Sequence, residues 1–317
     1  MVNRGPNKNM VLKNKRGIFF TTFVILVLTI FFITYTFYTS TNDRKTIHDR
    51  IVTMNSFVFS LEKDMSRQLF ISSYRALLSI ESEITETGLY MSNVKESIKE
   101  ALKNGTVNSK IANLMNGYLL TDWHLRVSNL GSTLNLQVNY TIENITITQN
   151  SPWELNINMA INLSIKDKNN LASWEKLKDI QAKINIEGLE DPLYLLNTNG
   201  LVANKIKKTP FIIFTEGNNI SNLNSHLENS YYISSQSAPS FLDRLEGKTN
   251  SNDNGIESLV NLNKLAEQNI QLKDKSVVDY IYFSAQNPTS YKIQGMPQWF
   301  KIDDSHLETY QLSNLTV

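Results

Sequence analysis

Residues 18–38, IFFTTFVILVLTIFFITYTFY, decide how the rest of the chain is organised. The segment contains no charged residue. At about 1.5 Å per residue, a helix of this length spans about 30 Å, which is the thickness of the hydrocarbon core of a bilayer. Its threonines are compatible with lipid because a helical Thr can donate its hydroxyl to a carbonyl three or four residues earlier. The segment therefore predicts a transmembrane helix.

The charges on either side of this segment predict its orientation. Every charged residue in 1–17 is basic, whereas acidic and basic residues alternate in 43–50. The positive-inside rule then places residues 1–17 in the cytoplasm and everything after Tyr38 outside the cell membrane. A cleaved secretory signal is the alternative, but its apolar core is usually only about 7–15 residues long. A retained single-pass anchor is the favoured interpretation.

Residues 39–103 predict a helical stalk. Its apolar positions recur with alternating spacings of four and three residues, the pattern of a coiled-coil seam. These positions are Ile47, Ile51, Met54, Val58, Leu61 and Met65. The seam covers fewer than three heptads, so it fits either a helix that packs on its own domain or self-association through the apolar helix and the stalk. Gly88 is expected to end the helix, and a shorter helix is expected over 92–103.

Residues 104–317 predict a mainly antiparallel β-rich domain, so the fold class expected for the whole chain is α+β. Apolar and polar residues alternate over 134–142 and over 155–165, which predicts two strands with one wet face each. The turn residues of 150–152 join them, so a meander is expected. The segment 172–181 fits either a helix or a further strand.

Other parts of this domain carry weaker patterns. Alternation at Trp123, Leu125 and Val127 predicts a strand, and the apolar segments 211–214 and 276–283 predict buried strands. The segment 256–269 predicts a helix, and 218–249 predicts a long polar loop region.

Composition excludes several classes of chemistry. The chain has 31 basic and 30 acidic residues, so no overall field draws it to nucleic acid, and no nucleic-acid partner is expected. It has no cysteine, which excludes disulfides, thiolate catalysis and Cys-ligated metals. The histidines show no ligand spacing, and no common catalytic or phosphate-binding motif occurs, so no cofactor and no metal site is expected. The histidines are His48, His124, His226 and His306.

Two clusters of ionisable residues remain as candidates for chemistry. Asp303, Asp304 and His306 form the tightest acid–histidine cluster, for which a solvated turn is the expected structure. Acidic residues also surround Gly188 and Pro192 in a predicted turn, namely Glu187, Glu190 and Asp191. Carboxylates can serve acid–base catalysis only if the fold aligns them, so no residue is assigned a catalytic role. A membrane-anchored extracytoplasmic hydrolase that uses these acids is the alternative function.

Six glycosylation sequons occur after the apolar segment, and all lie on the side expected to be external. The candidate acceptors are Asn104, Asn139, Asn144, Asn162, Asn219 and Asn314. With 38 Asn and 54 Ser plus Thr among 317 residues, chance alone gives 38 × 54/317, or about 6.5. The number of sequons is therefore no evidence for topology.

Five segments together resemble uncharacterised membrane-anchored archaeal surface proteins with a type IV pilin-like N-terminus. They are Lys15-Arg16-Gly17, LFISSYRALLSIE (69–81), IEGLEDPLYLLNTNG (186–200), SAPSFLDRLEG (237–247) and SVVDYIYF (276–283). The resemblance implies a processing site between Gly17 and Ile18. A pilin-type signal commonly has Glu at the fifth mature position, where this chain has Thr22.

The expected function is that of a single-pass, membrane-anchored extracellular structural or interaction protein, either a pilin-like subunit or an anchored adhesion or assembly component. Its expected partners are the lipid bilayer, other copies of the chain and other surface proteins. The domain boundaries expected are 1–17 for the cytoplasmic segment, 18–38 for the transmembrane helix, 39–103 for the stalk and 104–317 for the β-rich domain.

Overall fold

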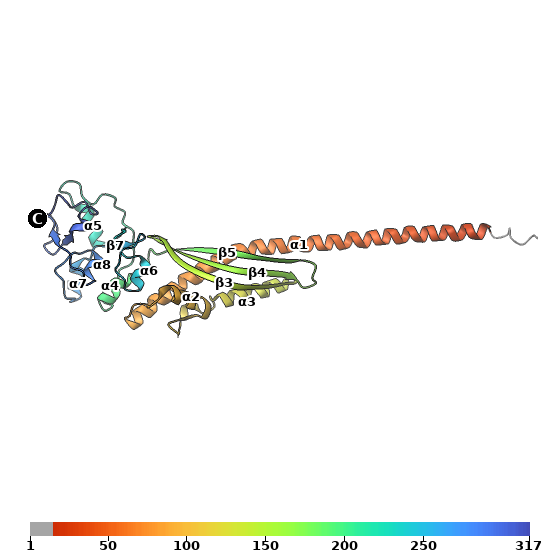
Figure 1. The fold of residues 1–317 in the computed structure, drawn as a ribbon, viewed down its shortest axis with the longest axis horizontal. Helices are drawn as coiled ribbons and strands as arrows, with labels where there is room; N and C mark the ends of the chain where they lie inside the picture. The colour runs from red at the N-terminus through yellow and green to blue at the C-terminus, as the bar shows by residue number, and fades with distance from the viewer. Residues whose placement is uncertain (1–14) are drawn as a thin grey trace, which may run out of the picture.

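The computed structural model describes residues 15–317 and shows an α+β protein with one very long N-terminal helix, α1 (Figure 1). Helix α1 runs from Lys15 to Thr87, 73 residues without a break. At about 1.5 Å per residue it is about 110 Å long. The predicted anchor and most of the predicted stalk are thus one continuous helix. Residues 1–14 of the expected cytoplasmic segment lie outside the described residues.

The N-terminal part of α1 is a bare apolar helix. Phe20, Ile25 and Phe32 are each about two-thirds exposed, at 66%, 65% and 68%. As expected, threonine hydroxyls in this part donate to earlier carbonyls, with Thr34 2.9 Å from the carbonyl oxygen of Ile30. Within residues 15–317, α1 is the one helix long and apolar enough to cross a membrane.

The C-terminal part of α1 packs into the body of the protein. Met54, Val58 and Leu61 of the predicted seam are buried, whereas Ile47 and Ile51 remain 38% and 42% exposed. From Met54 onward the seam therefore packs on the chain's own fold. Ile47 and Ile51, the first two seam positions, lie nearer to the apolar part of the helix and are only partly covered.

A three-stranded antiparallel meander forms the centre of the body. Strands β3 (Leu136–Ser151), β4 (Glu154–Asp167) and β5 (Ser173–Asn185) pair in the order β3-β4-β5. The two predicted strands and the turn at 150–152 are confirmed, and the ambiguous segment 172–181 belongs to β5. In β4 a buried residue alternates with a half-buried or exposed one along the strand. The buried face joins α1 in one hydrophobic core.

Two ion pairs fix α1 to this sheet. Arg50 Nε donates to Asp167 Oδ1 at 2.8 Å, at the end of β4. Further along α1, Glu62 Oε1 lies 2.5 Å from Lys178 Nζ of β5. The helix and the sheet therefore form one body with a shared core, which contains residues from both sides of the expected boundary at 103/104.

Helix α3 (Leu120–Thr133) replaces the strand expected at Trp123, Leu125 and Val127. Trp123 and Val127 are buried with Leu120 and Gly131 at helical spacing, while Leu125 is 61% exposed. The alternation prediction was wrong here because three residues cannot distinguish a period of two from a period of 3.6. The Asp122 carboxylate caps the helix by accepting from the backbone amide of Leu119 at 3.1 Å.

Short elements connect α1 to the meander. Gly88 follows the end of α1, as predicted, and has a positive φ of 66° that favours glycine. The elements are α2 (Val94–Asn104), the hairpin strands β1 (Thr106–Val107) and β2 (Lys110–Ile111), and the 3₁₀ helix η1 (Asn113–Met115). Helix α2 confirms the short helix expected over 92–103.

The C-terminal part of the chain lies at the end of the molecule opposite to the start of α1 and has a second core (Figure 1). Its helices are α4 (Pro192–Asn197), α5 (Ser221–Glu228), α6 (Phe241–Leu245), α7 (Leu262–Glu267), α8 (Asp279–Tyr282) and α9 (Asp304–Leu307). Its strands form two small antiparallel pairs, β6 (Tyr232–Ser234) with β7 (Ile256–Ser258), and β8 (Ser290–Lys292) with β9 (Lys301–Asp303).

Several predictions for this part were wrong. The segment 276–283 is buried as expected, but it contains the short helix α8 in place of a central strand. The segment 211–214 forms no strand, and 256–269 divides into β7 and α7. The polar segment 218–249 contains α5, β6 and α6. Elements of three to eight residues are too short for periodicity to identify them.

Candidate functional site

The three acidic residues of the predicted 187–191 turn lie in three different environments. Glu187 is exposed, Glu190 is half-buried, and Asp191 has no exposed surface. Asp191 caps α4, and its Oδ1 accepts from the backbone amide of Leu193 at 2.9 Å. The backbone amide of Glu190 donates to Glu81 Oε1 of α1 at 3.1 Å. Although the three residues are close in sequence, no two of their carboxylates form a catalytic pair.

Asp191 belongs to a buried ion cluster centred on Arg244. The guanidinium Nη1 lies 2.6 Å from Asp191 Oδ2 and 2.9 Å from Asp279 Oδ2, and all three side chains are fully buried. Tyr232 donates its hydroxyl to Asp191 at 2.8 Å, and Ser258 donates to Asp279 at 2.8 Å. The cluster joins α4, α6, β6, β7 and α8, so it ties together segments far apart in the sequence.

The charge balance of this cluster favours a structural role. Burial opposes the charge on Arg244, but the carboxylates of Asp191 and Asp279 outweigh it and raise the pKa of the guanidinium. Two carboxylates share one guanidinium, so burial still raises the pKa of Asp279. A fully enclosed group cannot reach a substrate. The cluster can orient backbone segments, but it cannot act as an acid or a base on a bound molecule.

In the acid–histidine cluster near the C-terminus, Asp303 and His306 are buried and Asp304 is exposed, so the expected solvated turn was wrong for two of the three residues. Asp303 and His306 have 0% and 1% of their surface exposed. His306 Nδ1 lies 2.6 Å from Asp303 Oδ1, and Nε2 lies 3.3 Å from Glu257 Oε2. Nε2 also lies 3.1 Å from the hydroxyl of Tyr280. Spacing alone could not find Glu257, which reaches this cluster from β7.

His306 is held in its charged form by these neighbours. Burial lowers the pKa of His306, but the hydrogen bonds and charges of Asp303 and Glu257 outweigh it and raise the pKa to about 10. For Asp303, burial raises the pKa, but hydrogen bonds from His306 and Ser305 outweigh it and lower it to about 2. The pair is therefore ionised across neutral pH. An enclosed histidine that stays charged across neutral pH is a poor proton shuttle, so this cluster also favours a structural role.

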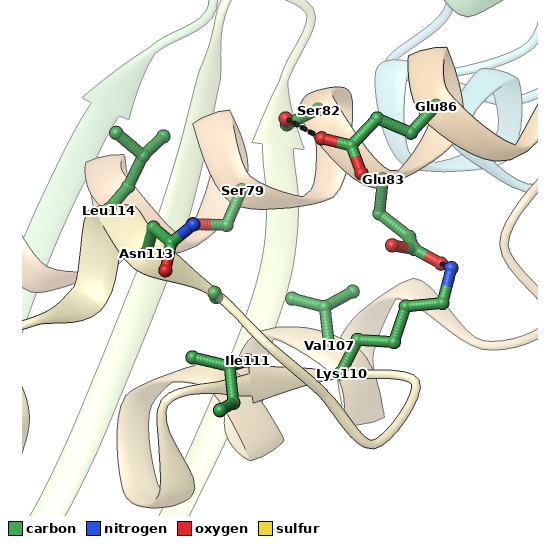
Figure 2. Close-up of a pocket in the computed structure, with 10 residues that line it drawn as sticks. Ser79, Ser82, Glu83, Glu86, Val107, Lys110, Ile111, Asn113 and Leu114 are labelled. Atoms are coloured by element: carbon green, nitrogen blue, oxygen red, sulfur yellow. Dashed lines mark hydrogen bonds and ion pairs between the residues drawn. The ribbon is translucent and has the colours of Figure 1, made fainter.

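A small polar cavity lies between the end of α1 and the β1–β2 hairpin (Figure 2). Its volume is about 120 Å³. Lys110 Nζ lies 2.8 Å from Glu83 Oε1, and Ser82 donates to Glu86 Oε1 at 3.1 Å. Ser79 donates to the backbone carbonyl of Arg75 at 2.8 Å. These groups are partnered within the protein, so the cavity fits water molecules and presents no free reactive group.

The histidines do not gather into a metal site. His226 is buried and packs against Phe214, and burial lowers its pKa to about 4. His124 packs edge-on against Tyr140, with ring centroids 4.7 Å apart. Within residues 15–317, no group of three His, Cys, Asp or Glu residues could hold a metal ion.

The predicted modification sites lie at several places. Gly17 and Ile18 lie in the first turn of α1, where only the backbone is described. Asn104 ends α2, Asn219 precedes α5, and Asn314 lies near the C-terminus, all exposed. The remaining sequons lie in the meander, with Asn139 and Asn144 on β3 and Asn162 on β4.

Comparisons of the chain with protein-family models, with curated proteins and with solved structures found no match.

Proposed function

We propose that this chain is a single-pass membrane protein with its N-terminus in the cytoplasm and its body outside, where it serves as a pilin-like structural or interaction subunit. One observation carries the proposal. A single unbroken helix leaves its apolar N-terminal part fully uncovered and uses its C-terminal part as a core element of the body.

The uncovered part of α1 needs an apolar environment. Large side chains surround the helix on every side, including Phe23, Phe31 and Phe37 at 57%, 67% and 72% exposure. Soluble monomers rarely expose apolar patches of more than a few hundred Å². Lipid satisfies this requirement, and so does the equivalent helix of another copy. The absence of charge in 18–38 fits both partners.

The unbroken helix also supports a structural role. No loop separates the apolar part from the body, and Arg50 holds the helix to the end of β4 at Asp167. The orientation of the anchor therefore determines the orientation of the body. Such a rigid connection suits a subunit that must take a fixed position among its neighbours. The buried, paired state of Asp191, Arg244 and His306 supports an interaction role over hydrolysis.

Disulfide cross-linking tests the proposed assembly, because the chain has no cysteine of its own. Phe31→Cys places a unique thiol on the apolar part of α1, and Leu177→Cys places one on β5 at similar exposure, 67% against 62% for the native side chains. In oxidised membranes that contain the full chain, we expect a covalent dimer for F31C and a monomer for L177C. Monomers for both variants would overturn assembly through α1 and leave lipid as its sole cover.

A further inference from the structure

The outer face of the meander points away from the core, and its residues on β3 and β4 are exposed or half-buried. On β4 the buried apolar residues alternate with half-buried residues on this outer face. In the central part of this face five pairs of outward residues lie across β3 and β4, namely Asn139 with Ser164, Thr141 with Asn162, Asn144 with Ala160, Thr146 with Asn158, and Thr148 with Asn156. These ten positions carry amides, hydroxyls and one methyl group, and the outward charges of β4, Glu154 and Lys166, lie at its two ends.

The uncharged central part of this face includes β3, which is an edge strand of the sheet. In the order β3-β4-β5 both β3 and β5 are edges, but their compositions differ. Strand β5 carries five charged residues, whereas the 16-residue β3 carries one, Glu143. Long edge strands with little charge are prone to pair with other chains, and proteins protect such edges by charge or by a cover. Strand β5 has the charge. On β3, Ser128 of α3 donates to the carbonyl of Val138 at 3.0 Å and Asn254 donates to that of Gln149 at 2.9 Å, so the part of the edge between these two residues requires another form of protection.

Three of the six sequons lie on this same face. Side chains two residues apart in a strand share a face, so each acceptor Asn and its hydroxyl residue point outward together. The pairs are Asn139 with Thr141, Asn144 with Thr146, and Asn162 with Ser164. The sequons therefore supply six of these ten central positions.

The structure distinguishes among the three acceptors. Asn139 and Asn144 are exposed on the edge strand, and a register shift between Ile142 and Asn144 marks a β-bulge at Glu143, directly before Asn144. A bulge bends the strand and re-aims its side chains. Asn162 lies on the central strand, half-buried between Thr141 on β3 and Leu177 on β5. An enzyme that approaches the folded sheet therefore reaches the two edge residues and not Asn162.

We propose that Asn139 and Asn144 carry asparagine-linked oligosaccharides that cover the outer face and the edge of β3, and that Asn162 stays unmodified. This proposal rests on the proposed function, which places the sheet on the side of the membrane where such transfer takes place. The two acceptors are five residues apart along β3, about 16 Å at ~3.3 Å per residue, so both glycans can be accommodated.

The co-reactant is an oligosaccharide linked through phosphate to a polyprenyl lipid, and a membrane-bound oligosaccharyltransferase catalyses the transfer. The amide nitrogen Nδ2 forms a bond to the sugar's anomeric carbon as the bond from that carbon to the phosphate oxygen breaks. Nδ2 loses one proton, and the lipid phosphate leaves with the bonding electron pair. No group is oxidised or reduced.

Glycopeptide mass measurement on the full chain tests the proposal, in cells whose oligosaccharyltransferase modifies a second, known glycoprotein. We expect an oligosaccharide mass on the peptides that contain Asn139 and Asn144. Thr141→Val and Thr146→Val keep each Asn and suit a strand but remove its sequon, so each variant should lose one glycan. Ser164→Ala removes the sequon of Asn162 from the same face and should lose none.

The outcomes separate this proposal from the proposed function. Unmodified Asn139 and Asn144 overturn it, as does an oligosaccharide on Asn162 at the occupancy of Asn144. If protease added to intact cells digests the body while Asn139 and Asn144 are bare, the glycan proposal fails and the topology stands. If the body is protected from protease and every sequon is bare, the proposed topology fails as well.

Discussion

The guanidinium of Arg244 lies between two buried carboxylates, 2.6 Å from Asp191 and 2.9 Å from Asp279. Arg244 lies in α6, Asp191 caps α4 and Asp279 begins α8, so the three residues are separated by up to 88 positions in the sequence. Arg244 also donates to the backbone carbonyl of Ile256 in β7. One side chain therefore connects four segments of the C-terminal part.

Replacing this guanidinium should strongly destabilise the body. Arg244→Met leaves two carboxylates buried without a cation, and breaking a buried ion pair from one side typically costs about 3–5 kcal/mol. Chemical unfolding of the detergent-solubilised chain, followed by tryptophan fluorescence, measures the change. Arg67→Met is the matched control, because Arg67 and Asp64 form an exposed pair 3.5 Å apart on α1. We expect the control to lose less than about 1 kcal/mol, and an equal loss in both variants would contradict the role of Arg244.

The charged state of His306 predicts how stability depends on pH. The ordinary pKa of histidine is about 6.5, and the folded protein raises that of His306 to about 10. Because the folded state binds this proton more tightly, its contribution is complete below about pH 6.5 and is lost as the pH rises toward 10. Unfolding free energies measured from pH 6 to 10 should therefore fall with pH.

His306→Gln should flatten this dependence, since glutamine does not titrate. His48→Gln is the control, because His48 is exposed on α1 before the helix enters the core. We expect His48→Gln to keep the slope of the native protein. A slope that is unchanged in His306→Gln would show that the buried cluster does not carry it.

The packing of the seam predicts a difference between two positions on the same helix. Leu61 is 5% exposed and contacts the core, whereas Ile47 is 38% exposed beyond the body. Leu61→Ala should reduce the unfolding free energy by about 2–5 kcal/mol, the range for buried leucines. Ile47→Ala should change it little. Similar losses at both positions would indicate that the seam is covered along its whole length.

Strong periodic patterns predicted the parts of the fold that are long. The uncharged run of 18–38 is long enough to identify a helix, and the alternation of 155–165 is long enough to show the period of a strand. Both elements are confirmed. Short elements such as α8 do not show a period. The same limit applies to the buried clusters. From the sequence, Arg244 would be expected on the surface of its short helix. Its partners Asp191 and Asp279 are distant in the sequence and are brought to it only by the fold.

The proposed pilin-like role predicts proteolytic processing. Cleavage between Gly17 and Ile18 would remove the basic residues that hold the precursor at the cytoplasmic face and leave Ile18 as the new N-terminus of an apolar helix. N-terminal sequencing or intact-mass measurement of protein from native membranes should therefore find a chain that begins at Ile18. A chain that still carries Met1 or Val2 would contradict the pilin-like part of the account and leave a plain anchor.

The central claim is that the apolar part of α1 crosses the membrane and holds the body outside. Single cysteines labelled in intact cells with a membrane-impermeant maleimide test it most directly, because the native chain contains no cysteine. We expect Thr41→Cys and Leu177→Cys to be labelled from outside and Ile30→Cys under neither condition. In the unprocessed chain, which still carries residues 1–17, Asn3→Cys should be labelled only after permeabilisation. Labelling of Ile30→Cys, or of Asn3→Cys in intact cells, would contradict the claim.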